Sequence, residues 1–250
     1  MIDRERFFRA LATVLGADKG DGGIGTLGEK LLHAVLKYYL DENPLNHEKK
    51  VGGFFADVMN EDGILEIQTR QLYRLGRKLE YMLGEHTVTV VYPIARERRV
   101  AWIDPVSGEL SPKRKSPKRG RITDVIPELY RIRPYLSHPN FRLRLILLDC
   151  DEYKKRSATP RAWRRTERVE RIPREPIDDI LLSCPNDYRI FLPASLPLRF
   201  TSADVARASR IPRSIASTLL LLLTDLGVVR RIAREGRAIV YEMTEAEPNA

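Results

Sequence analysis

The chain has 250 residues, of which 43% are hydrophobic and 31% are charged. This balance is typical of a folded chain of one or two domains and excludes an intrinsically disordered one. The net charge of +9 indicates a polyanionic partner such as nucleic acid.

The cysteines and histidines bear on metal sites, disulfides and cellular compartment. There are two cysteines, with no CxxC pair, and the histidines have no mutual ligand spacing, so His33 and the others are expected to be incidental. This excludes a structural zinc site and a disulfide framework and favours a reducing cytoplasm. The longest apolar run, residues 219–223, is too short for a membrane span, and residues 1–15 lack a signal-peptide core. We therefore expect a soluble, cytoplasmic protein with no membrane contact.

The N-terminal segment predicts two helices. Residues 3–15 are amphipathic, and a glycine-rich loop follows at 20–25. Residues 27–40 carry apolar side chains at helical spacing. Thr26 is a suitable N-cap for this helix, with Glu29 three residues later in a capping-box arrangement.

An acidic hairpin is expected next. Residues 53–58 and 64–70 are apolar runs joined by a polar turn that contains Asp-Gly, so they predict neighbouring antiparallel strands. Asp57 and Glu66 lie on adjacent strands, and Glu66 and Gln68 point to the same face because strand side chains alternate. Two carboxylates on one face form a hard-oxygen site suited to Mg²⁺ or Mn²⁺.

Further alternation of helices and strands predicts an α/β core with a mixed sheet. The expected elements are a helix at 71–83, strands at 87–92 and 100–103, a helix at 124–130 and a strand at 142–148. Residues 111–121 form a basic loop with no acidic residue. Residues 151–178 are basic and contain Pro160 and Pro173, so they predict a linker.

The C-terminal segment has a different organisation. Helices are expected at 201–209, capped by Thr201 or Ser202, and at 212–226, which Gly227 ends. Two strands follow at 228–233 and 238–243. Helix, turn, helix and hairpin is the layout of a winged helix-turn-helix. The predicted organisation is a domain over 1–150, a basic linker over 151–178 and a winged-helix domain over 179–250.

The first domain resembles the PD-(D/E)XK nuclease superfamily, and most of all its Holliday-junction-resolvase-like members. The resemblance covers roughly residues 22–95 and rests on Gly25-Thr26-Leu27-Gly28-Glu29, on Asp57, and on Glu66-Ile67-Gln68-Thr69-Arg70. It implies a restriction-endonuclease-like fold, a mixed sheet flanked by helices. It also implies that Asp57, Glu66 and the Ile67 carbonyl hold a divalent metal. Glu29 would approach that metal directly or through a water, unless it only caps its helix.

The sequence departs from the family pattern at Gln68, where the family usually has lysine. A neutral amide can hydrogen-bond a water but cannot neutralise charge on the phosphate. Lys78 on the following helix is the expected substitute, with Arg70 second. Two alternatives stay open: catalysis is lost and the domain only binds DNA, or the carboxylates are merely a solvated hairpin face.

Basic and polar residues indicate where DNA would bind. In the winged helix, the start of the second helix would enter the major groove and the wing tip would reach phosphates or the minor groove. The alternative is a winged helix used for protein contact. The expected DNA contacts are Lys113, Arg114, Lys115, Lys118, Arg119, Arg121, Arg213, Ser214, Ser217, Thr218, Arg234 and Arg237.

The sequence therefore predicts a Mg²⁺- or Mn²⁺-dependent DNA endonuclease with Glu29, Asp57, Glu66, Gln68 and Lys78 at its active site. Its substrate would be double-stranded or branched DNA, and a homodimer is left open. The main alternative is a non-catalytic DNA-binding transcriptional regulator that keeps a nuclease-like scaffold. A third interpretation is a protein-interaction module with incidental basic charge.

Overall fold

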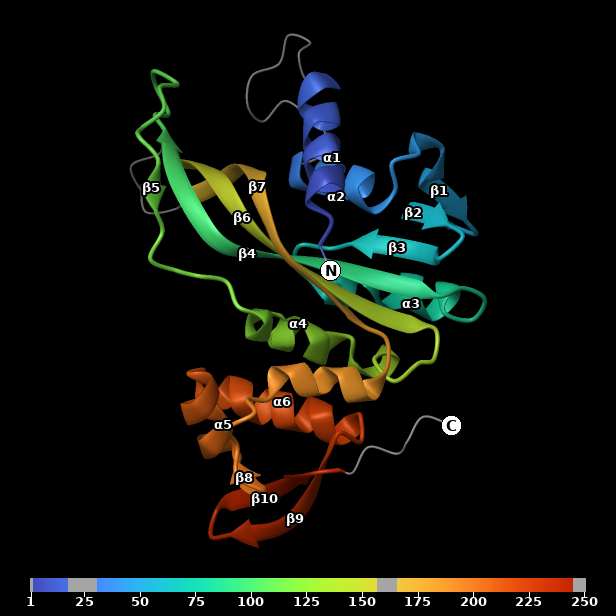
Figure 1. Cartoon of the computed structure of the whole chain (residues 1–250), viewed down its shortest axis with the longest axis vertical. Helices are drawn as coiled ribbons and strands as arrows, with labels where there is room; N and C mark the ends of the chain where they lie inside the picture. Colours follow the sequence, from blue (N-terminus) through green and yellow to red (C-terminus); the bar gives the residue numbers. More distant parts are fainter. Residues whose placement is uncertain (1, 18–30, 157–165, 245–250) are drawn as a thin grey trace. The chain divides into compact units, whose positions relative to one another are not determined.

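The structure is a computed structural model, and it describes residues 2–17, 31–156 and 166–244 (Figure 1). Glu29, Thr26 and the glycine-rich loop lie outside the described residues. The chain is α/β, with a mixed seven-stranded sheet and a separate three-stranded antiparallel sheet. The predicted fold class is confirmed at this level. None of the helices in the described ranges has the length and apolar character needed to cross a bilayer.

The large sheet has β1 and β7 at its two edges, and β5 pairs with β4. Its strands are, in sheet order, β1 (His47–Val51), β2 (Phe54–Asn60), β3 (Gly63–Ile67), β4 (Val88–Ile103), β6 (Phe141–Arg156) and β7 (Thr166–Leu182), with β5 at Arg114–Lys115. The helices that accompany them are α1 (Arg4–Ala17), α2 (Leu31–Leu40), η1 (Pro44–Asn46), η2 (Leu72–Leu75), α3 (Gly76–Met82), η3 (Ile122–Val125), α4 (Ile126–Arg131) and η4 (Arg133–Tyr135).

Helices α1 and α2 build the core that supports β2 and β3. Phe7 of α1 and Val35 and Leu36 of α2 are fully buried in one cluster with side chains of β2, β3, β4 and β6. Burying large apolar side chains in this way contributes about 1.5–3 kcal/mol each. The two predicted helices are therefore confirmed over Arg4–Ala17 and Leu31–Leu40, and α2 packs against the acidic hairpin.

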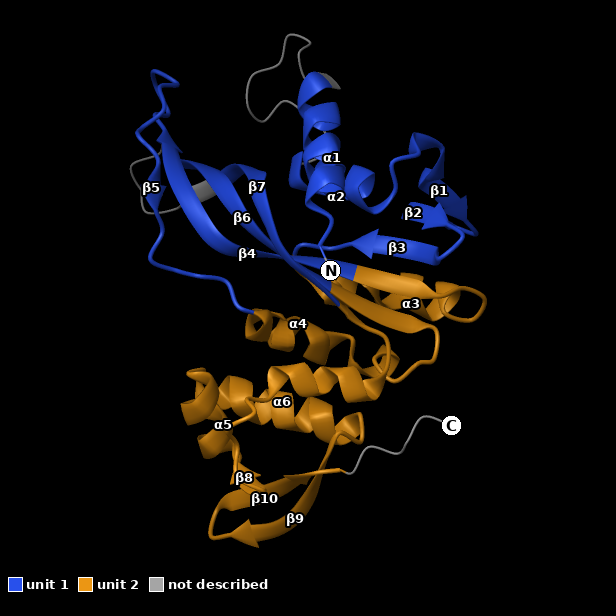
Figure 2. Cartoon of the chain, in the orientation of Figure 1, with its two compact units in different colours: residues 1–69, 91–121, 145–180 blue, residues 70–90, 122–144, 181–250 orange. Residues whose placement is uncertain are grey.

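Two compact units divide the chain, and neither is continuous in sequence (Figure 2). Unit 1 comprises residues 1–69, 91–121 and 145–180, and unit 2 comprises 70–90, 122–144 and 181–250. Residues 151–156 and 166–178, expected to be linker, lie in strands β6 and β7. The linker interpretation is wrong for these residues, and they contribute one of the sheet edges.

Cross-strand ion pairs explain why this charged segment forms strands. Arg171 of β7 lies 3.3 Å from Glu152 of β6, and Arg174 lies 4.0 Å from Asp151. The same reason applies to β4, which continues as one strand through residues 93–99 rather than forming two. There, Arg96 donates two hydrogen bonds to Asp149, at 2.9 and 2.8 Å.

The C-terminal part of unit 2 consists of short helices and a three-stranded antiparallel sheet. η5 (Pro185–Phe191) precedes β8 (Arg199–Thr201), α5 (Ser202–Ser209), α6 (Arg213–Asp225), β9 (Val229–Glu235) and β10 (Ala238–Met243). Strand β8, which the sequence pattern did not indicate, pairs with β10. Thr201 caps α5 by accepting hydrogen bonds from the Ala203 and Asp204 amides. Gly227 follows α6 with φ 71°, as expected of a helix stop.

Candidate active site and nucleic-acid surfaces

The acidic hairpin of β2 and β3 forms as predicted. The strands pair antiparallel, with Val58 opposite Leu65 and Asn60 opposite Gly63. The same register, carried one residue further, sets Asp57 opposite Glu66. Directly opposed residues of an antiparallel pair project from the same face. The hairpin therefore presents its two carboxylates from adjacent strands.

Asp57 is held between a strand and a helix. Its Oδ2 accepts a 2.6 Å hydrogen bond from the Ile67 amide at the end of β3. His33 of α2 places Nε2 3.3 Å from the same oxygen. Both side chains keep some solvent access, 18% for Asp57 and 23% for His33, whereas Glu66 is 2% exposed. A partly open carboxylate beside a buried one is an arrangement that can meet a ligand from solution.

A pocket of about 240 Å³ lies within unit 1 and is linked to Asp57 through two of its lining residues. Its walls come from the start of α2, the end of β3 and the start of β7. Two of the lining residues, His33 and Ile67, are the hydrogen-bond partners of Asp57. The full lining is Leu32, His33, Ile67, Gln68, Thr69, Arg168, Val169, Glu170 and Arg171.

The donor set fits a hard divalent cation only in part. Among the residues that the structure describes, no group of three or more His, Cys, Asp or Glu is arranged to hold a metal ion. Asp57 and Glu66 supply the carboxylate oxygens that Mg²⁺ prefers, and Mg²⁺ commonly binds through one or two carboxylates, waters and substrate phosphate. The predicted ligand Glu29 falls outside the described residues. The metal site stays a prediction.

Gln68 and Lys78 have different placements. The backbone N–H of Gln68 donates a 2.9 Å hydrogen bond to the Val91 carbonyl, which anchors the end of β3 to β4. Gln68 also lines the pocket. Lys78 lies on α3, in unit 2, whereas the carboxylates and Gln68 belong to unit 1. Its role as the substitute for a motif lysine stays a prediction.

Sequence reasoning missed three residues of this region. His33 was expected to be incidental, yet it contacts Asp57. Its position four residues after Glu29 on the predicted helix, and so on the same helix face, was the available signal. Arg168 and Arg171 fell in the segment expected to be linker, and only the sheet brings them to the pocket.

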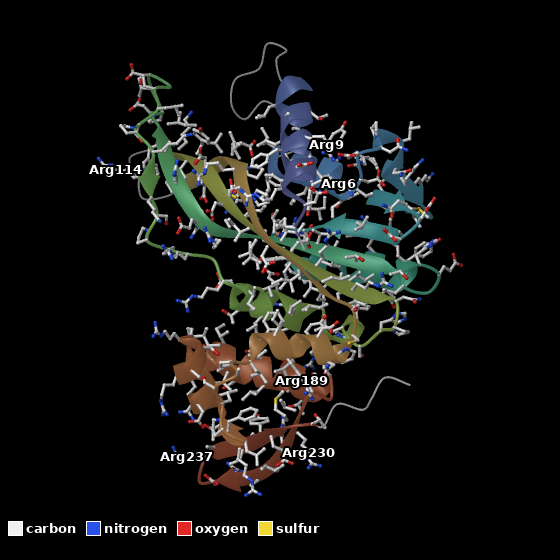
Figure 3. The ribbon with its side chains drawn as sticks, viewed as in Figure 1. Arg6, Arg9, Arg114, Arg189, Arg230 and Arg237 are labelled. Carbon is white, nitrogen blue, oxygen red and sulfur yellow. The ribbon has the colours of Figure 1, made fainter. Side chains whose placement is uncertain are left out.

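The basic loop is partly neutralised within the chain. Lys113 lies 2.6 Å from Asp151, and Lys115 and Arg119 lie 2.8 and 2.9 Å from Glu97. These cations keep 43–64% of their side-chain surface exposed. Arg114, on β5 (Figure 3), and Lys118 and Arg121 are also exposed. Because exposed ion pairs are weak, phosphate contact by this loop stays a prediction.

The C-terminal helices and hairpin expose most of the residues expected to contact DNA. Arg213, Ser214 and Ser217 are exposed at the beginning of α6. Thr218 is partly buried, and its hydroxyl donates to the Ser214 carbonyl at 3.0 Å, so it serves the helix itself. Arg234 and Arg237 are exposed on and after β9, with Arg237 at the tip of the wing (Figure 3). Contact of these residues with DNA stays a prediction.

The acidic hairpin and the residues that line the pocket fall within the range that a protein-family model matches. A family model, "Domain of unknown function (DUF8091)", matches residues 30–183. An uncharacterized protein of Treponema pallidum (strain Nichols) is 33% identical over 132 residues, which are 52% of this chain and 52% of that protein. The match thus spans about half the length of this relative. No solved structure matches the chain.

Proposed function

The chain belongs to the DUF8091 family, and we propose that it is a metal-dependent DNA endonuclease brought to its substrate by the winged helix. The observation that carries this proposal is the pair Asp57 and Glu66 on neighbouring strands β2 and β3, where the Asp57 partners His33 and Ile67 line a pocket with two arginines. Carboxylates suit a divalent metal, and arginines suit a phosphate. This region therefore offers groups that can bind the metal and groups that can bind the phosphate in phosphodiester hydrolysis.

Each residue has a distinct part in the proposed reaction. Asp57 and Glu66 would hold Mg²⁺ or Mn²⁺, which when bound polarises the phosphate and lowers the pKa of a bound water. The Ile67 amide and His33 orient the Asp57 carboxylate through their contacts with Oδ2. Gln68 can hydrogen-bond the attacking water, and its neutrality leaves the phosphate charge to other groups.

The winged helix supplies attraction to DNA in this proposal. Arg213, Arg234 and Arg237 are exposed at the helix start and on the wing. Phosphate contacts of this kind hold a protein on DNA without specifying sequence. Lys113, Arg114, Lys115, Lys118, Arg119 and Arg121 would add contacts where their internal ion pairs open.

A second candidate function is a non-catalytic DNA-binding regulator. It is favoured by Gln68 at the position of the motif lysine and by the lack of a three-residue metal group among the described residues. In that case the Asp57 contacts serve to fasten α2 to β3, and only the winged helix binds DNA.

Cleavage of plasmid and branched DNA in Mn²⁺ separates the two. We expect metal-dependent cutting by the native chain and none by Asp57→Ala, with DNA binding retained. The matched control is Asp62→Ala, which removes an exposed carboxylate from the turn of the same hairpin and should still cut. Equal cutting by Asp57→Ala would refute the site. Tight binding with no cutting of any substrate would favour the regulator.

A separate variant tests the substitute for the motif lysine. If Lys78 neutralises charge at the phosphate, Lys78→Ala should lower the turnover number while DNA binding persists. Normal turnover by Lys78→Ala would remove this residue from the active site.

A further inference from the structure

The pocket beside Asp57 is lined by residues of different chemical kinds. Leu32, Ile67 and Val169 are apolar, Gln68 and Thr69 carry polar groups, and Arg168 and Arg171 are cationic. The pocket also has one acidic residue, Glu170, whose Oε1 accepts a 2.8 Å hydrogen bond from the Arg171 amide. Apolar and cationic residues lining one pocket suit a ligand that has an apolar part and an anionic part.

Arg171 is a largely buried cation of this pocket. Its Nη2 lies 3.3 Å from Glu152 Oε2, and 14% of its side chain is exposed. Its Nε is shielded from solvent and has no hydrogen-bond partner among the described residues. A buried donor in this state calls for an explanation, and a bound anion beside Arg171 would give it an acceptor. The Glu152 contact meanwhile keeps the guanidinium in place.

The size of the pocket limits what it can hold. Ligand pockets usually measure about 300–1,000 Å³, and this one measures about 240 Å³. The space suits a single nucleotide. A base stacked within a duplex cannot enter such a pocket unless it leaves the stack, which costs least where it is already unpaired.

We propose that this pocket binds one unpaired nucleotide, with its phosphate on Arg168 and Arg171 and its base against Leu32 and Val169. The inference rests on the proposed nuclease and names its substrate class. The Asp57 contacts with His33 and Ile67, which both line the pocket, place the bound nucleotide next to the phosphodiester to be cut. The substrate is therefore DNA with a flap, a single-stranded end or an extruded nucleotide, rather than continuous duplex.

Nucleotide binding can be measured without any cleavage. The full chain is titrated by calorimetry, in metal-free buffer, with thymidine 5′-monophosphate, thymidine and inorganic phosphate. We expect the monophosphate to bind most tightly, because it alone offers both parts. Val169→Trp fills the pocket, and Arg168→Gln removes a cation without adding bulk. Each should weaken monophosphate binding by about tenfold or more, as expected for losing a charge-assisted hydrogen bond or the apolar wall.

The control is Val106→Trp, which adds the same bulk at a side chain that is 93% exposed and should not change binding. If Val169→Trp fails to fold, as judged by circular dichroism, Arg168→Gln decides the question alone. Unchanged binding by the folded variants overturns the proposal. Phosphate that binds as tightly as the monophosphate also overturns it, because the pocket would then be an anion site only.

Cleavage assays keep this proposal separate from the proposed function. Flapped and single-stranded-ended DNA should be cut faster than a continuous duplex of the same sequence, and Val169→Trp should remove that preference. Cutting that ignores both the flap and Val169→Trp overturns the pocket while the nuclease stands. Pocket-dependent nucleotide binding with no cutting supports the pocket while the nuclease fails.

Discussion

Glu152 offers a sharp test of how the sheet tolerates its charges. The carboxylate has 5% of its side chain exposed and lies 3.3 Å from both Lys154 and Arg171 and 4.0 Å from Arg98. Glu152→Gln keeps the shape and removes the charge, which leaves three cations facing a neutral amide. Breaking a buried pair by removing one partner costs about 3–5 kcal/mol.

The expected loss for Glu152→Gln is about 3 kcal/mol, the lower end of that range. Lys154 and Arg98 keep 27% and 23% of their side chains exposed, so water can compensate them in part. In urea unfolding followed by circular dichroism, this loss lowers the midpoint by about 1–3 M at the slopes common for globular proteins. Glu97→Gln is the matched control. It also faces two cations, Lys115 and Arg119, but these are 59% and 64% exposed, so its midpoint should move far less.

The pH dependence of the unfolding midpoint tests the same role of Glu152 independently. Burial raises the pKa of the Glu152 carboxyl, but attraction to Arg171, Lys154 and Arg98 outweighs burial and holds the pKa below its ordinary value. A lowered pKa in the folded state contributes stability above the unfolded pKa of about 4.3 that is lost as the pH falls through the folded pKa. The difference between native chain and variant should therefore shrink on acidification below about pH 4. Equal midpoints for Glu152→Gln and the native chain at pH 7 would refute the reasoning.

Two further predictions concern the proposed winged helix and the thiols. Arg234→Gln and Arg237→Gln should each weaken duplex binding and reduce the slope of log K against log salt concentration by about 0.9 per lost phosphate contact. Fluorescence anisotropy over a salt series measures this slope, with Arg99→Gln, exposed on β4, as the control. An unchanged slope would contradict contact between the wing and DNA. Burial raises the pKa of the Cys150 thiol to about 12, whereas Cys184 is exposed. At pH 8 the native chain should thus release one equivalent of chromophore rapidly from a disulfide reagent and two after unfolding, and two rapid equivalents in the native chain would show that Cys150 is accessible.

Local signals in the sequence were enough to predict the acidic hairpin and the helices of the C-terminal segment. The Asp62-Gly63 turn lies between two apolar runs, and Thr201 caps its helix with its own neighbours, so neither depends on distant residues. Metal binding and DNA cleavage are not tested by the fold and stay predictions.

The linker prediction for residues 166–178 was wrong because the strand that they form depends on pairing with a distant segment. By sequence alone, the charges of β7 resemble those of a solvated linker. The structure pairs Arg171 of β7 with Glu152 of β6, a strand that the sequence pattern does not place beside it. The pocket was out of reach for the same reason. His33, Gln68 and Arg168 come from three segments, and only the assembled sheet brings them together.

The edges of the large sheet carry a consequence for self-association. Unpaired edge strands invite a second chain to add a strand, and natural proteins discourage this with proline and charge. Edge strand β7 contains Pro173 and Pro176, which have no N–H to donate, and the opposite edge strand β1 exposes Lys49 and Lys50. Growth of the large sheet from copy to copy is therefore disfavoured at both of its edges.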